Sequence, residues 1–149
     1  PRIDLSGIDV ARKILILARE SGLEIELSDV KINSFLPKEV YDIEDSNLFL
    51  ESLKKNATHF NSYLKSAKDN KSSLKYVAKL DKDKAEVGLK EIHPGHDFFN
   101  IEGSDNIILF YTSRYKDNPL IIKGAGAGAA VTASGIFGDI IRIGKRWVK

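Results

Sequence analysis

The sequence of 149 residues predicts one domain of the α+β class. Apolar residues recur with helical spacing near both ends of the chain and alternate with period two in its middle. The two kinds of segment are not interleaved as regular βαβ units. This favours a mostly antiparallel or mixed sheet of about four to five strands covered by helices. The expected order of elements is α-β-α-β-β-β-β-α.

The first helix is expected to begin at a capping box made by Ser6 and Asp9. In such a box the serine oxygen accepts a hydrogen bond from a free amide of the first turn, and the acid three residues later reaches back. The helix should end before Gly22, because glycine suits the position after a helix C-terminus. The apolar residues that give it a wide buried face include Ile8, Ala11, Leu15 and Ala18.

A short strand and a second helix come next. The strand is expected over 30–32, and Pro37 ends the segment that contains it. The helix is expected over 44–68, with acidic residues early and lysines late, as the helix dipole favours. Its expected buried residues are Leu48, Leu50, Leu53, Phe60 and Leu64.

Strands dominate the following region. Apolar residues alternate with lysines over 74–80, and a polar turn over 81–84 leads into a second alternating run over 85–89. This pattern predicts a β-hairpin. Two more strands are expected over 106–113 and 120–123, and the first should be central because it is nearly all apolar.

Composition excludes several classes of protein. The absence of cysteine excludes a disulfide framework, a thiolate metal site and a cysteine nucleophile. With 23 basic and 21 acidic residues, the charge is too even to indicate a nucleic-acid partner. No apolar run approaches the roughly 20 residues needed to span a bilayer, and nothing resembles a signal peptide. We therefore expect a cytoplasmic protein with no membrane partner. The chain starts at Pro1 and lacks methionine, which indicates a domain cut from a longer protein.

A glycine-rich segment separates the last expected strand from a final helix over 129–147. Gly124, Gly126 and Ala129 satisfy the dinucleotide pattern G-x-G-x-x-G/A. Such a turn exposes backbone amides where an anion or an oxygen-rich ligand can approach without meeting a Cβ. The last helix runs to the end of the chain, so a self-contained Rossmann domain is excluded. A turn of small residues where helix and strand pack closely remains an alternative.

Asp9 and Lys13 are four residues apart and share one face of the first helix, and Asp4 lies just before it. An aspartate beside a lysine in a cleft can bind an ammonium or a hydroxyl and can hold an amine ready for proton transfer. The spacing alone favours the simpler interpretation, a surface ion pair that contributes only about a few tenths of a kcal/mol.

Two histidines and an acid, His93, His96 and Asp97, are neighbours in the sequence. Pro94 and Gly95 between the histidines make a turn, and no further ligand lies nearby in the sequence. We expect a loop here and no metal ion.

Three segments carry a family resemblance when they are read together. The chain begins PRIDLSGIDVARK, continues in its middle with FFNIEGSDN, and has GAGAGAAVTA followed by Gly138-Asp139 near its end. These segments resemble, in the same order, the P-R-x-D-L-x-G-x-D-V-A-R-K motif, the intervening segment and the C-terminal G-x-G-A-G-x-x-V-T-A…D signature of homoserine dehydrogenases. The run FYTSRY over 110–115 is most similar to forms fused behind an aspartokinase.

The resemblance implies that residues 1–149 are the substrate-binding, catalytic and dimer-forming domain of a homoserine dehydrogenase. Such enzymes interconvert L-homoserine and L-aspartate 4-semialdehyde with NAD or NADP, in the biosynthesis of threonine, methionine and isoleucine. By matching position, Lys13 would donate and accept the proton at the substrate oxygen. Asp9 would bind the homoserine hydroxyl and orient Lys13, and Asp4 would help to hold the substrate ammonium. Gly128 and Gly126 would approach the cofactor.

The same resemblance implies that an N-terminal Rossmann domain, absent here, binds most of the cofactor. The partners expected are therefore that domain, the substrate and a second copy of the chain in a homodimer. A different interpretation is a noncatalytic α+β module for ligand sensing or protein interaction, in which Asp9 and Lys13 form a surface pair. The catalytic interpretation requires Asp4, Asp9 and Lys13 to converge beside a concave surface.

Overall fold

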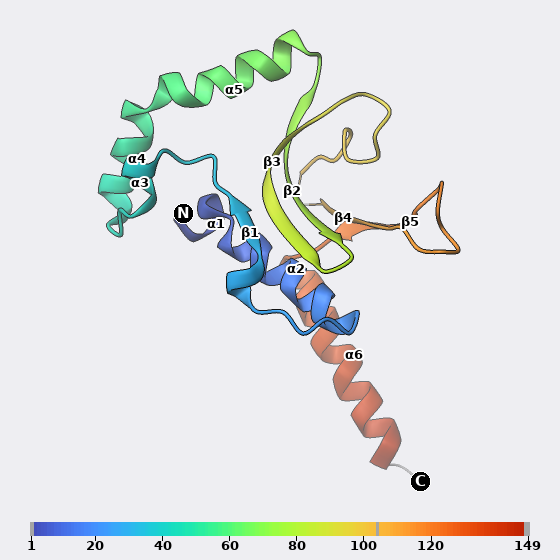
Figure 1. Cartoon of the computed structure of the whole chain (residues 1–149). Coiled ribbons are helices and arrows are strands. Elements are labelled where there is room, and N and C mark those ends of the chain that lie inside the picture. The colour runs from blue at the N-terminus through green and yellow to red at the C-terminus, as the bar shows by residue number, and fades with distance from the viewer. Residues whose placement is uncertain (1, 104, 148–149) are drawn as a thin grey trace. The chain divides into compact units, whose positions relative to one another are not determined.

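The computed structural model describes residues 2–103 and 105–147. Pro1 and Ser104, which belong to the motifs quoted above, lie outside the described residues. The chain divides into two compact units, unit 1 (Pro1–Phe99) and unit 2 (Asn100–Lys149). Helices and strands occur in the predicted order, some helices being subdivided, and the α+β class is confirmed (Figure 1).

Unit 1 contains a three-stranded mixed sheet and several helices. Its strand order is β1-β3-β2, with β1 parallel and β2 antiparallel to the central β3. The predicted hairpin is present as β2 and β3, joined by a two-residue turn between the paired residues Asp81 and Lys84. In chain order the elements are α1 (Arg2–Ser6), α2 (Ile8–Glu20), η1 (Leu27–Asp29), β1 (Lys31–Asn33), α3 (Lys38–Tyr41), α4 (Ser46–Lys55), α5 (Ala57–Asp69), β2 (Ser73–Asp81) and β3 (Lys84–Ile92).

The main core of unit 1 lies where α2 packs on the sheet. Helical spacing places one face of α2 inward, and alternation along β3 supplies the opposing side chains. Val87 on β3 is fully buried there, and Tyr76 and Ala78 of β2 pack at its margin. The buried members of this core are Ala11, Ile14, Leu15, Val30, Ala85 and Val87.

The start of the first helix differs from the prediction. The helical segment begins at Arg2 and is interrupted at Gly7, which is the N-cap of α2 with φ of 87°. The N-cap of α2 is Gly7 rather than Ser6, so the predicted capping box is wrong. The hydroxyl of Ser6, a residue of α1, donates to the carbonyl of Ile3 at 2.8 Å and accepts a hydrogen bond from the amide of Ile8, the first residue of α2, at 3.5 Å.

The predicted helix over 44–68 is divided into α4 and α5 at Asn56. The side chain of Asp45 caps α4 by accepting hydrogen bonds from the amides of Asn47 and Leu48. The buried face of α4 is centred on Phe49, which packs with Leu36 and Val40. Of the residues predicted to be buried, Leu53 and Phe60 pack against this cluster, whereas the break leaves others exposed: Leu48, Leu50 and Leu64.

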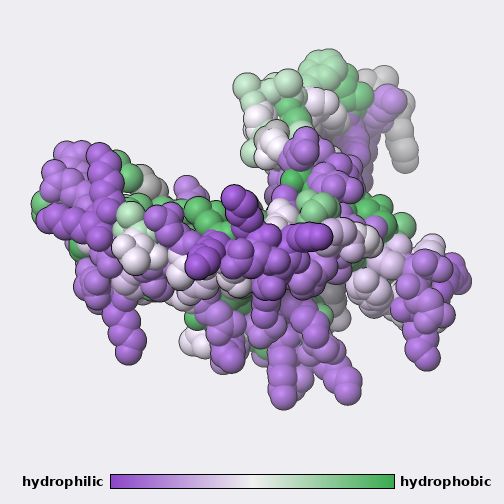
Figure 2. Space-filling model, turned by 90° about the horizontal axis from the view of Figure 1, so that it is seen from above, coloured by the Kyte–Doolittle hydropathy of each residue, from purple (hydrophilic) through white to green (hydrophobic). Residues whose placement is uncertain are grey.

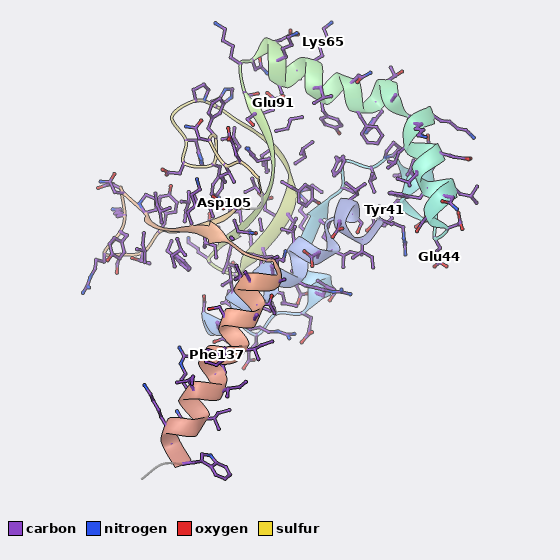
Figure 3. All side chains as sticks on the ribbon, turned by 180° about the vertical axis from the view of Figure 1, so that it is seen from behind. Tyr41, Glu44, Lys65, Glu91, Asp105 and Phe137 are labelled. Carbon is purple, nitrogen blue, oxygen red and sulfur yellow. The ribbon has the colours of Figure 1, made fainter. Side chains whose placement is uncertain are left out.

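Glu91 on β3 links the end of α5 to the sheet (Figure 3). Its carboxylate accepts hydrogen bonds from Ser66 at 2.6 Å, Asn70 at 2.9 Å and Ser72 at 3.0 Å. These donors, Ser66 first, favour the charged form and lower the pKa of Glu91 below its ordinary value. The cluster therefore holds the C-terminal end of α5 against β3.

Unit 2 contains β4 (Asp105–Phe110), β5 (Leu120–Ala125) and α6 (Ala129–Trp147). The two strands form an antiparallel sheet of their own, so the expected single sheet is divided in two among the described residues. The prediction that the apolar strand β4 is central is therefore wrong for the described part of the chain. The predicted final helix is confirmed with its bounds.

Unit 2 exposes many apolar side chains. Phe137 on α6 is 64% exposed, and no residue of α6 is buried (Figure 3). On the face of the molecule in Figure 2, apolar residues coloured green reach the surface between polar ones. None of the described helices is both long enough and apolar enough to cross a membrane.

Candidate active site

The candidate catalytic residues lie on the two helices that meet at Gly7. Asp4 belongs to α1, and Asp9 and Lys13 belong to the first turns of α2. The positive φ of Gly7 interrupts the helix and redirects the chain between them. This conformation is open to glycine and strained for other residues.

Asp9 and Lys13 form an ion pair within α2. The Nζ atom of Lys13 lies 2.7 Å from Oδ2 of Asp9. The side chains are 63% exposed for Lys13 and 43% exposed for Asp9, so the pair borders on solvent. Because Asp9 has no capping bond to make, its carboxylate is available both to the amine and to a ligand.

Asp4 and Asp9 line one shallow pocket of unit 1, with a volume of about 270 Å³. Carboxylates supply its charged groups, and aliphatic and aromatic side chains supply most of its surface. Lys13 is not among the lining residues, but it forms an ion pair with Asp9, which is. The full lining is Asp4, Leu5, Asp9, Val10, Phe35, Tyr76 and Leu89.

The pocket includes residues that the sequence did not single out. Tyr76 on β2 and Phe35 meet edge to face with ring centroids 5.9 Å apart. Burial raises the pKa of Tyr76, and the phenol of Tyr41 adds a smaller effect in the same direction. Alternation along β2 identified Tyr76 as a core residue, but no signal in the sequence connected it with Asp4 and Asp9.

The glycines predicted to contact a cofactor lie in unit 2, between β5 and α6. A Cβ at Gly126 would lie 2.7 Å from Cγ of Asn106, so close packing explains a glycine there. Gly128 differs, since its φ is 127° and a Cβ would meet nothing within 4 Å. Its carbonyl accepts the first hydrogen bond of α6 from the amide of Thr132 at 3.0 Å. The open backbone at a helix N-terminus fits the approach of an oxygen-rich ligand such as a nicotinamide cofactor.

The histidine-containing turn has a structural explanation. The Nδ1 atom of His96 accepts a hydrogen bond from the amide of Phe98 at 3.0 Å, and its ring packs beside the Phe98 ring. Within the described residues, no group of histidines and acids has the arrangement of a metal site.

Chemically, the pocket can bind a small cationic or hydroxylated molecule. Two carboxylates attract an ammonium and accept hydrogen bonds from hydroxyl groups. The amine next to Asp9 can exchange a proton with a bound oxygen within its reach. The apolar lining suits short methylene chains between such polar groups.

Comparison with known proteins shows the family of this chain. A family profile described as homoserine dehydrogenase matches residues 1–141. The chain is 46% identical over 145 residues to the bifunctional aspartokinase/homoserine dehydrogenase 1 of Zea mays, covering 96% of this chain and 16% of the relative. It is 40% identical over 149 residues to the homoserine dehydrogenase of Saccharomyces cerevisiae, covering 98% of this chain and 41% of the relative.

A solved structure is similar as well. The crystal structure of a Candida auris protein of unknown function matches with a TM-score of 0.85 and 39% identity, covering 98% of this chain and 41% of that one. The profile and the curated relatives point to one family, and the chain spans 16% to 41% of the length of these relatives and of this solved structure. This chain belongs to the homoserine dehydrogenase family.

Proposed function

We propose that this chain is the substrate domain of an enzyme that interconverts L-homoserine and L-aspartate 4-semialdehyde with a nicotinamide cofactor. The supporting observation is that Asp4 and Asp9 line one pocket, with Nζ of Lys13 2.7 Å from Asp9. All three residues occupy the positions of the family's N-terminal motif. Membership of the family and the chemistry of the pocket thus lead to the same reaction.

In the proposed mechanism Lys13 moves the proton at the reacting oxygen. During oxidation the neutral form of its amine takes the proton from the homoserine hydroxyl and becomes the ammonium that pairs with Asp9, and during reduction this ammonium returns the proton to the aldehyde oxygen. Asp9 holds Lys13 at 2.7 Å and accepts a hydrogen bond from the substrate hydroxyl. Asp4 lies on α1, across Gly7 from Asp9, and pairs with the substrate ammonium.

The open backbone at Gly128, together with Gly126 two residues earlier, is the proposed cofactor contact of this chain. When bound, NAD or NADP supplies the oxidant or reductant of the reaction. A Rossmann domain outside this chain is proposed to hold most of the cofactor. The remaining partner proposed is a second copy of the chain, because the exposed apolar residues of β4, β5 and α6 provide surface that a partner can bury.

The test uses the complete gene product that contains this chain. Homoserine-dependent reduction of NAD or NADP is measured by absorbance, with matched assays on other small hydroxylated amino acids. Turnover with homoserine that is lost in Lys13→Ala supports the proposal. A folded gene product that does not oxidise homoserine contradicts it and favours the noncatalytic ligand-sensing or interaction module.

A further inference from the structure

The hydroxyl of Tyr76 is a polar group to which the proposed mechanism gives no role. Its oxygen is buried, and it has no hydrogen-bond partner in the described part of the chain. A buried hydroxyl without a partner is unfavourable, because it has given up its hydrogen bonds to water. For packing alone, phenylalanine would serve better at this position, so the oxygen calls for another explanation.

The hydroxyl lies directly against the backbone of Gly7. A Cβ at Gly7 would overlap the Tyr76 hydroxyl, and it would lie 2.9 Å from Cζ of the same ring. The Cγ2 atom of Ile32 would be 3.2 Å away. The phenol and Ile32 thus fill the space beside Gly7, and the tip of Tyr76 supports the chain at this point.

Gly7 is the single residue between α1 and α2. Its position therefore determines how Asp4, on α1, lies relative to Asp9, on α2. Asp9 and Lys13 belong to the same helix, so their mutual distance does not depend on this joint. Tyr76 lines the pocket, but its oxygen is buried and lies against Gly7, so replacing tyrosine by phenylalanine keeps the lining ring and removes only the contact of the oxygen with Gly7.

We infer that Tyr76 is a positioning residue: its hydroxyl supports Gly7 and so fixes the separation between Asp4 and the Asp9–Lys13 pair. The effect on substrate binding that we expect from this role rests on the proposed function. Homoserine carries an ammonium and a hydroxyl at a separation limited by its short carbon chain. A change in the spacing of Asp4 and Asp9 should therefore weaken substrate binding, while proton transfer between Lys13 and the bound oxygen is largely retained.

The test is Tyr76→Phe in the complete gene product, which removes the oxygen and keeps the ring. The KM for homoserine should rise about tenfold, while kcat stays within about twofold and the KM for the cofactor is unchanged. The matched control is Tyr63→Phe on α5, whose ring packs against His59 with centroids 5.3 Å apart, away from the pocket lining. It should leave all three constants unchanged.

A second measurement follows the joint itself by amide hydrogen exchange of Gly7 and Ala11, whose amides donate to the carbonyls of Asp4 at 3.3 Å and of Gly7 at 2.9 Å. Tyr76→Phe should accelerate this exchange, and Tyr63→Phe should not. An unchanged KM for homoserine together with raised thermal stability in Tyr76→Phe would overturn the inference, because the hydroxyl would then be only a packing defect.

The two proposals can fail separately. If the unmodified gene product oxidises homoserine and Tyr76→Phe behaves like it, the proposed function stands and the positioning role is wrong. If the unmodified gene product does not oxidise homoserine, the proposed function is wrong, and exchange alone decides the role of Tyr76. Unchanged amide exchange in Tyr76→Phe would then show that the hydroxyl does not support Gly7, and faster exchange would show that it does.

Discussion

Asp9→Asn separates catalysis from stability in this protein. The variant keeps the shape of the side chain and removes the charge that pairs with Lys13 at 2.7 Å. An exposed pair four residues apart on a helix contributes about 0.3–0.5 kcal/mol. Asp9 makes no capping bond, but it is the acidic residue in the first turn of α2, so its loss also removes a favourable interaction with the helix dipole of about 0.3–1 kcal/mol. Both losses together correspond to a decrease in Tm of about 1–6 °C for a chain of this length.

The expected effect on catalysis is much larger. If Asp9 binds the substrate hydroxyl and orients Lys13, Asp9→Asn should lower kcat and raise the KM for homoserine. Lys13→Ala should lower kcat by about 10²–10⁴-fold, which corresponds to about 3–5 kcal/mol of transition-state stabilisation. The catalytic effect therefore exceeds the stability effect by roughly several-fold. A folded variant with very low turnover is the expected outcome.

The assay is steady-state turnover of the complete gene product in both directions, with thermal unfolding measured on the same samples. The chain offers a matched control in Glu86→Gln, which removes the same charge from an exposed pair with Lys90 at 3.5 Å. This control should retain full turnover. Near-normal turnover of a folded Asp9→Asn would refute the role of Asp9, and an active Lys13→Ala would refute the mechanism.

Further predictions concern the rest of the chain. Gly128→Ala, which forces a Cβ onto a residue with φ of 127°, should raise the KM for the cofactor more than that for homoserine, as steady-state kinetics would reveal. Glu91→Gln should destabilise the fold at neutral pH. Because folding lowers the pKa of Glu91, its contribution is fully present above the ordinary pKa of the carboxyl group and is lost as the pH falls through the lowered pKa, so the melting curves of variant and parent should converge in acid. Phe49→Ala removes a fully buried side chain and should cost about 3–5 kcal/mol in denaturant unfolding. The isolated chain should sediment as a dimer and show no dehydrogenase activity; a monomer over a wide concentration range, or steady turnover, would contradict this prediction.

The sequence by itself determined the local elements. Helical periodicity gave α6 with its bounds, and alternation gave the β2–β3 hairpin, because both patterns depend on residues that are neighbours along the chain. The motif around Asp4, Asp9 and Lys13 likewise identified the family, since it is a continuous stretch of residues. These inferences did not depend on which helices and strands pack together in the fold.

Only the tertiary structure decided where helices break and which side chains share the pocket. The break at Gly7 depends on Tyr76 and Ile32, which reach it from strands distant in the sequence. Phe49 on α4 packs with Leu36 and Val40, and Phe60, beyond the break at Asn56, packs against the same cluster. Periodicity records which face of a segment is apolar but not where that face must turn to meet its partner. For that reason the sequence predicted a capping box at Ser6, whereas long-range packing placed a glycine joint between the two carboxylates of the candidate site.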